Sequence, residues 1–189
     1  MFLRRVSLAT ALTLAPLAAF AQWQADPSHT SVTFEVDHLG FSVLHGRFQN
    51  IDPVVSFDPE DIEATEISVT IDASSVYSGW ESRDEHLTQG DFLNAEEFPE
   101  ITFVSTSVAQ TGEDTADITG DLTMLGQTRE VVFAATLNQI GPFPFNPEMQ
   151  VAGFTATGSV DRTEFGMDFG APVIPAVIPV TVNLEMIKQ

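Results

Sequence analysis

Residues 31–38 read Ser-Val-Thr-Phe-Glu-Val-Asp-His, and within this stretch Val32, Phe34 and Val36 alternate with polar residues. Successive side chains of a β-strand point to opposite faces of its sheet, so the stretch predicts a strand with one apolar and one polar face. The same two-residue period recurs at 44–48, 54–57, 66–72, 101–103, 117–124, 131–137, 154–160 and 180–186. The sequence therefore predicts a mainly β fold with about eight or more strands.

Short turns separate the predicted strands. Asp58-Pro-Glu-Asp61 and Thr111-Gly-Glu-Asp114 are two of them, and both are rich in residues that favour turns. Such short connections join antiparallel neighbours. We expect an eight-stranded antiparallel barrel, because closing the sheet on itself removes its exposed edges. A sandwich of two sheets is the alternative.

One segment departs from the alternation. Ser78-Gly-Trp-Glu81 and Ser82-Arg-Asp-Glu85 are overlapping capping-box patterns, and Gly90 is a typical helix terminator. These residues predict one short helix, from about Gly79 to Gln89, packed at the rim of the barrel. The stretch Asn94-Ala-Glu-Glu97 predicts a further single helical turn.

The N-terminal segment has the composition of a secretory signal peptide. Arg4 and Arg5 precede an apolar run that ends in Ala19-Phe-Ala21. A membrane-anchoring helix is the alternative, but the run contains Pro16 and is shorter than the roughly 20 apolar residues that a span needs. We therefore expect residues 1–21 to be a signal peptide that is cleaved on export, by the general or the twin-arginine route. Residues 22–189 are expected to form one domain.

The charge of residues 22–189 limits the classes of partner. This part of the chain contains 27 acidic and 5 basic residues, a net charge of −22. Binding of nucleic acid, or docking on an anionic leaflet, needs a basic face, so neither is expected. No second apolar span is present that could insert stably in a membrane. The chain also lacks cysteine, so the fold depends neither on disulfides nor on thiolate–metal sites.

The number of phenylalanines bears on whether the barrel interior is a cavity or a solid core. Phe occurs 15 times in the sequence, 13 of them after residue 21, whereas Tyr occurs once and Trp twice. An eight-stranded barrel can hold one slim ligand if some inward positions are small. Ala156 and Gly158 share a predicted face with Phe154. A ligand cavity and a solid core filled by Phe side chains are both compatible with this pattern.

Five blocks of residues, in order along the chain, resemble the motifs of YceI-like proteins. The third block reads Arg83-Asp-Glu-His-Leu87, followed by Phe98-Pro-Glu-Ile-Thr-Phe103. Each block alone is a weak signal, but five in the same order are a strong one. The blocks span nearly all of residues 22–189, and lie at 26–34, 38–48, 83–106, 120–128 and 153–167.

The resemblance implies a lipocalin-like antiparallel barrel, commonly periplasmic, with a long isoprenoid or similar lipid in an apolar tunnel. It favours the cavity over the solid core. We accordingly expect a lipid-binding or carrier protein that is not an enzyme and has no cofactor. An enzyme or redox accessory acting on a bound lipid or quinone is the alternative, and the identity of the lipid and the existence of a homodimer are left open. The expected tunnel residues are Phe34, Val36, Ile71, Phe103, Phe133, Phe154 and Ala156.

Three polar residues are candidates for contact with a lipid headgroup. Arg83 and His86 lie three residues apart on the predicted helix, and therefore on one side of it. His38 continues the apolar face of residues 32–36. The planar guanidinium of arginine fits phosphate or carbonyl oxygens. The alternative is that Arg83, Asp84 and His86 hold the helix on the barrel rim through internal hydrogen bonds and an ion pair.

Two sets of neighbouring residues contain the types needed for a hydrolase triad: Asp26, Ser28 and His29, and Ser82, Asp84 and His86. Sequence neighbours rarely reach the geometry of a triad, and no Gly-x-Ser-x-Gly motif is present. A metal site formed by His29, His38 and His45 with carboxylates is also conceivable, but their spacing matches no metal-binding motif. We therefore expect neither a catalytic site nor a metal site.

Overall fold

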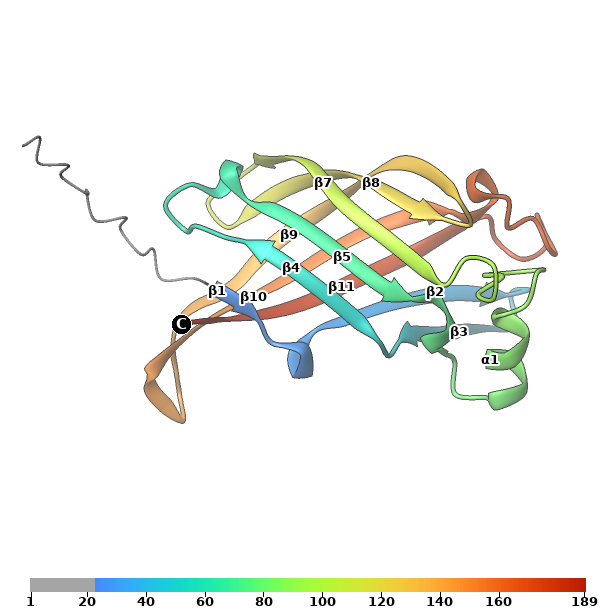
Figure 1. The fold of residues 1–189 in the computed structure, drawn as a ribbon, viewed down its shortest axis with the longest axis horizontal. Helices are drawn as coiled ribbons and strands as arrows, with labels where there is room; N and C mark the ends of the chain where they lie inside the picture. Colours follow the sequence, from blue (N-terminus) through green and yellow to red (C-terminus); the bar gives the residue numbers. More distant parts are fainter. Residues whose placement is uncertain (1–22) are drawn as a thin grey trace, which may run out of the picture.

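The computed structural model describes residues 23–189, so the expected signal peptide lies outside the described residues. It contains one 11-stranded sheet, one α-helix and four short 3-10 helices (Figure 1). The strands are β1 (Trp23–Ala25), β2 (Ser31–His38), β3 (Ser42–Phe48), β4 (Ile51–Ser56), β5 (Glu66–Asp72), β6 (Val76–Tyr77), β7 (Glu100–Gln110), β8 (Thr115–Met124), β9 (Gln127–Phe143), β10 (Asn146–Asp161) and β11 (Val177–Lys188). The helices are η1 (Pro27–His29), η2 (Ile62–Ala64), η3 (Ala73–Ser75), α1 (Glu81–Leu87) and η4 (Arg162–Phe165).

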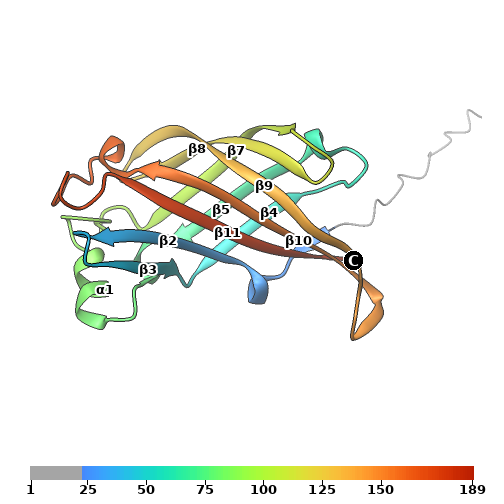
Figure 2. The ribbon, with the colours of Figure 1, turned by 180° about the vertical axis from the view of Figure 1, so that it is seen from behind.

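The strands form a single antiparallel sheet that is rolled into a barrel (Figures 1 and 2). Their order is β4-β5-β7-β8-β9-β10-β11-β2-β3-β6, and β1 pairs with β11. Most neighbours in this order are also neighbours along the chain, as expected for strands joined by short turns. The predicted mainly β, antiparallel fold class is confirmed. The sandwich alternative is wrong, because every described strand belongs to one sheet.

The barrel differs from the predicted one in strand number and in closure. The short strands β1 and β6 were not predicted, because two or three residues cannot display an alternating pattern. Within the described residues no hydrogen-bonded ladder joins β4 to β3 or β6, so the sheet is open along one seam. The seam is bridged locally: the Asn50 N–H donates to Ser75 Oγ at 3.1 Å, and the rings of Trp23 and Phe57 lie 5.7 Å apart.

Helix α1 lies at one end of the barrel, as predicted (Figures 1 and 2), but it is shorter than the predicted Gly79–Gln89. Its N-cap is Trp80, which makes no side-chain cap bond. The predicted capping boxes do not form, because the Ser78 N–H instead donates to Oδ1 of Asp84 at 2.7 Å and Ser82 lies inside the helix. The predicted turn at 94–97 is confirmed by a hydrogen bond from the Phe98 N–H to the Asn94 carbonyl at 2.9 Å.

The segment between β10 and β11 lies at the same end as α1, which we call the α1 end. This segment folds around Arg162, whose side chain is only 4% exposed. The guanidinium donates to the carbonyl oxygens of Met167, Ile174 and Pro175. Burial lowers the pKa of Arg162 from its ordinary value, and the nearby Asp168 partly opposes that shift. Arg162 therefore holds in place the segment between β10 and β11 at the α1 end of the barrel.

The opposite end carries the β9–β10 hairpin and the C-terminus, and we call it the hairpin end (Figures 1 and 2). Each end has its own apolar cluster. Phe165 and Met167 belong to the cluster at the α1 end, and Trp23 and Met186 to the cluster at the hairpin end. Within residues 23–189, no helix combines the length and the apolar character that crossing a membrane requires.

We expect Arg162→Met to lower the free energy of unfolding by about 3 kcal/mol, because three carbonyl oxygens lose a charged donor in a buried place. The control is Arg47→Met, since Arg47 is exposed and its guanidinium carbon lies 5.3 Å from the Tyr77 ring centroid. That contact is worth about 0.5 to 1 kcal/mol at an exposed site. Urea unfolding of both variants measures the difference, and equal losses would contradict the role given to Arg162.

Candidate functional site

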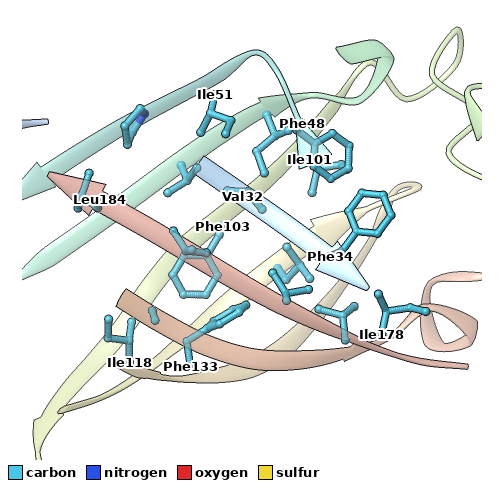
Figure 3. Close-up of a pocket in the computed structure, with 18 of the residues that line it drawn as sticks. Val32, Phe34, Phe48, Ile51, Ile101, Phe103, Ile118, Phe133, Ile178 and Leu184 are labelled. Carbon is cyan, nitrogen blue, oxygen red and sulfur yellow. The ribbon is translucent and has the colours of Figure 1, made fainter. Parts of the chain in front are cut away.

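The barrel encloses a cavity of about 590 Å³ (Figure 3). Side chains from all nine of the longer strands contribute to its wall, and most of them are apolar. This volume lies within the range of small-molecule sites, about 300–1,000 Å³. Of the two alternatives that the aromatic content left open, the structure has the cavity.

The wall is built by the alternation that first indicated strands. On β2, Val32, Phe34 and Val36 face the cavity, whereas the intervening polar residues face outward. Phe34, like Phe103, Phe133 and Phe154, is only half-buried although it points inward, because it borders open space on one side. Side chains in a solid core would instead be fully enclosed.

All seven apolar residues predicted for the tunnel lie on this wall, although their contact with a lipid stays a prediction. They are Phe34, Val36, Ile71, Phe103, Phe133, Phe154 and Ala156. The ring of Phe154 lies edge to face with that of Phe57, with centroids 5.2 Å apart. Phe57 also lines the cavity; it ends the alternating stretch 54–57 of the sequence but was not among the predicted tunnel residues.

The three headgroup candidates also border the cavity, at the α1 end. Arg83 donates from Nε to Ser78 Oγ at 2.7 Å and from Nη2 to the Ser78 carbonyl at 2.8 Å. These are the internal hydrogen bonds of the structural alternative. The ion pair of that alternative is not formed by Arg83 within the described residues. His38 is exposed at the end of β2.

An aromatic cluster that the sequence did not predict lies beside His86. The rings of His86, Phe92 and Phe169 contact one another edge to face, with centroids 5.0 to 5.8 Å apart. Nε2 of His86 also lies 3.5 Å from Oδ2 of Asp91. All three ring-bearing residues border the cavity, so the cluster forms part of its wall at the α1 end. Phe169 escaped prediction because it stands in an irregular segment without alternation.

Neither serine–histidine set has the geometry of a catalytic triad. Nδ1 of His29 lies 2.8 Å from Asp26 Oδ2 and 3.1 Å from Ser28 Oγ. A triad needs one ring nitrogen on the acid and the other on the nucleophile, but here a single nitrogen faces both. In the second set, Asp84 bonds to Ser78 and not to His86.

The three histidines weighed as metal ligands do not come together. His45 lies 3.4 Å from a carboxylate oxygen of Glu35, whereas His29 lies beside Asp26 and Glu185. The described residues contain one group of three potential ligands, formed by Asp26, His29 and Glu185, with ligand atoms within 4.8 Å of one another. This group stands outside the cavity and is explained by ordinary pairing of a histidine with carboxylates.

The sequence and fold resemble those of known proteins. The model of the YceI-like domain matches residues 23–186, which is nearly all of the described chain. The chain belongs to the YceI-like family. Among its relatives, the "UPF0312 protein" of Pseudomonas putida is 39% identical over 186 residues, covering 97% of this chain and 95% of the relative.

Solved structures of YceI-like proteins have a similar fold. The YCEI protein of Campylobacter jejuni aligns with a TM-score of 0.73 and 23% identity, covering 96% of this chain and 99% of that one. BcnA of Burkholderia cenocepacia aligns with a TM-score of 0.75 and 22% identity, covering 86% and 99%. A polyisoprenoid-binding domain of Saccharophagus degradans aligns with a TM-score of 0.62 and 13% identity, covering 90% and 100%. At these identities the likeness concerns the fold.

The His29–Asp26 pair makes stability depend on pH in a defined direction. Hydrogen bonding to Asp26 raises the pKa of His29, and hydrogen bonding to His29 and Ser28 lowers the pKa of Asp26. The ionised pair is therefore fully formed between about pH 4 and pH 6.5. Its contribution is lost as pH rises through the raised pKa of His29, and also as pH falls through the lowered pKa of Asp26.

We expect Asp26→Asn to bring the pKa of His29 down toward its ordinary value, as measured by NMR titration of the ring proton Hε1. Glu185→Gln is the control, because Glu185 raises the same pKa only through its charge, at 3.7 Å, and makes no hydrogen bond to the ring. Glu185→Gln should lower the pKa of His29 by less than Asp26→Asn does. A larger decrease in Glu185→Gln than in Asp26→Asn would contradict the assignment.

Proposed function

We propose that this YceI-like protein binds an isoprenoid-type or similar long-chain amphiphile in its barrel and carries it in the periplasm. The observation that supports the proposal is the apolar cavity of about 590 Å³. Transfer of a hydrocarbon chain from water to such a wall contributes roughly 0.8 kcal/mol per CH₂ group. Ordering of the chain offsets part of this gain. Binding would thus be driven by transfer of the tail out of water.

Two further observations favour this function. The Saccharophagus degradans protein of similar fold is described as a polyisoprenoid-binding domain. Residues 1–21 have the composition of a signal peptide, which would export residues 22–189 as one domain. An enzyme or redox accessory is less well supported, because the geometry of both serine–histidine sets opposes hydrolase chemistry. Turnover of a bound lipid would decide for the enzyme.

The proposed orientation places the lipid's polar end at the α1 end of the cavity, near Arg83, His86 and His38. Arg83 uses Nε and Nη2 to bond to Ser78. Among the described residues, Nη1 has no acceptor, so it can donate to an oxygen of a ligand. The structural and the headgroup role of Arg83 are therefore compatible, because they use different nitrogens.

We expect Ala156→Trp to abolish uptake of geranylgeraniol while the protein remains folded. Ala156 lies on the cavity wall between two other inward residues, Ala135 and Val182, and an indole there would occupy the lumen. The control is Ala134→Trp, because Ala134 is exposed on the outer face of β9. Native mass spectrometry measures occupancy, and circular dichroism checks the fold. Equal occupancy in both variants would refute binding inside the barrel.

We expect Arg83→Ala to weaken binding of geranylgeranyl phosphate by about tenfold, and of geranylgeraniol much less, because one charged hydrogen bond is lost. Ser78→Ala is the control, since it removes an anchor of Arg83 but leaves the guanidinium in place. It should change both affinities alike. If Arg83→Ala weakens the binding of both ligands equally and lowers the melting temperature, the only role of Arg83 is to hold the helix on the barrel rim.

A further inference from the structure

Three glycines of the barrel each lie beside a phenylalanine of the preceding strand. The same arrangement therefore occurs in three separate hairpins of one sheet. The pairs are Phe34 with Gly46 in β2–β3, Phe103 with Gly120 in β7–β8, and Phe133 with Gly158 in β9–β10. All three phenylalanines line the cavity, into which they project from different strands (Figure 3).

Each ring occupies the space that a side chain on its glycine would need. A Cβ atom added to the glycine would lie far closer to the ring than the 3.0 Å below which real Cβ contacts essentially do not occur. The ring therefore rests directly on the glycine backbone, against the wall of the barrel. The atom nearest to the added Cβ is Cζ of Phe34 at Gly46, Cζ of Phe103 at Gly120, and Cδ1 of Phe133 at Gly158, and each would lie within 2.7 Å of it.

The backbone itself does not require glycine at these positions. None of the three has a positive φ, in contrast to turn glycines such as Gly40 and Gly126. Glycine in a strand is unfavourable, because it loses more backbone entropy on folding and has no side chain to pack. The neighbouring ring therefore explains the glycine, since only a position without a Cβ lets the ring lie against the wall.

We propose that Gly46, Gly120 and Gly158 determine the width of the hydrocarbon chain that the cavity accepts. The proposal rests on the lipid-binding function above. A side chain at any of the three would displace a ring. The strand backbone behind the ring blocks movement outward, so the ring would move into the cavity. Because the displaced rings narrow the lumen, a branched chain would lose more affinity than an unbranched one.

The contact between ring and glycine can be tested without any ligand. The Hα atom of Gly46 that stands in place of a Cβ lies against the Phe34 ring, so the ring current should shift its NMR resonance upfield. We expect Phe34→Leu to remove this shift at Gly46 and to leave the corresponding shift at Gly158, which Phe133 causes. If the Gly46 resonance does not move in Phe34→Leu, the contact does not exist and the proposal is overturned.

Gly46 is the best position for the binding test. The three atoms nearest to its added Cβ all belong to the Phe34 ring, whereas a backbone carbonyl also lies near Gly120 and near Gly158. Gly46→Ala is compared with Gly153→Ala on β10, where an added Cβ meets nothing within 4 Å. The probes are geranylgeraniol and hexadecanol, whose unbranched chain matches the main chain of geranylgeraniol in length.

We expect Gly46→Ala to weaken geranylgeraniol binding by about tenfold or more, the usual scale of overpacking, and hexadecanol binding clearly less. Gly153→Ala should change neither affinity. The double variant Gly46→Ala with Phe34→Leu removes the clash and should restore geranylgeraniol binding. Its affinity can be compared with that of the wild type even if Gly46→Ala alone fails to fold.

Two outcomes overturn the proposal in distinguishable ways. If Gly46→Ala folds and both glycine variants bind the two probes as the wild type does, lipid binding stands and the role of the glycines is refuted. The same holds if the double variant folds but does not bind geranylgeraniol. If the wild-type protein binds neither probe, the lipid-binding function itself fails, and the proposal on chain width fails with it.

Discussion

The structure depends on the removal of one face of a single sheet from water. Every longer strand has an apolar face because its residues alternate, and antiparallel pairing aligns those faces side by side. Rolling the sheet is the arrangement that encloses the face with no second layer to cover it. The seam between β4 and β3 shows that a continuous ladder is not needed, since side-chain contacts such as that of Trp23 with Phe57 cover the gap.

The size of the inward side chains determines whether the middle of the rolled sheet is filled or open. Large inward side chains at every position would make a solid core, so the lumen exists only where small residues, or rings that lie flat against the wall, leave room. Ala156 and Ala135 are paired across β9 and β10, and their short side chains project little into the lumen. Phe34, Phe103 and Phe133 leave room differently, because each rests on a glycine. Bulky residues can therefore supply apolar area without blocking the cavity.

The sequence predicted the wall well because a strand has a fixed two-residue period, so the polarity of Val36 or Ile71 indicates its face without knowledge of its partners. Contacts between distant segments have no such local signal. Arg162 bonds to carbonyls of residues 167, 174 and 175, and Phe169 meets the helix residue His86 only in the folded chain. The capping boxes failed for a local reason: Asp84 accepts the Ser78 N–H, and Ser82 lies inside the helix, so neither serine is the N-cap.

The polar residues of the cavity wall differ between its two ends, and this difference gives the cavity a direction. At the α1 end the cavity is bordered by two arginines, Arg83 and Arg162, with His38, His86 and one carboxylate, Asp37. At the hairpin end it is bordered by the carboxylates Glu113 and Asp114, in the turn between β7 and β8. A chain with few basic residues and a large negative charge repels an anionic or oxygen-rich group over most of its surface. Such a group would be repelled least beside the guanidinium of Arg83, and most beside Glu113 and Asp114. The apolar wall is the same for either orientation of a tail, so in the proposed function the charges at the two ends would determine the orientation of a bound amphiphile.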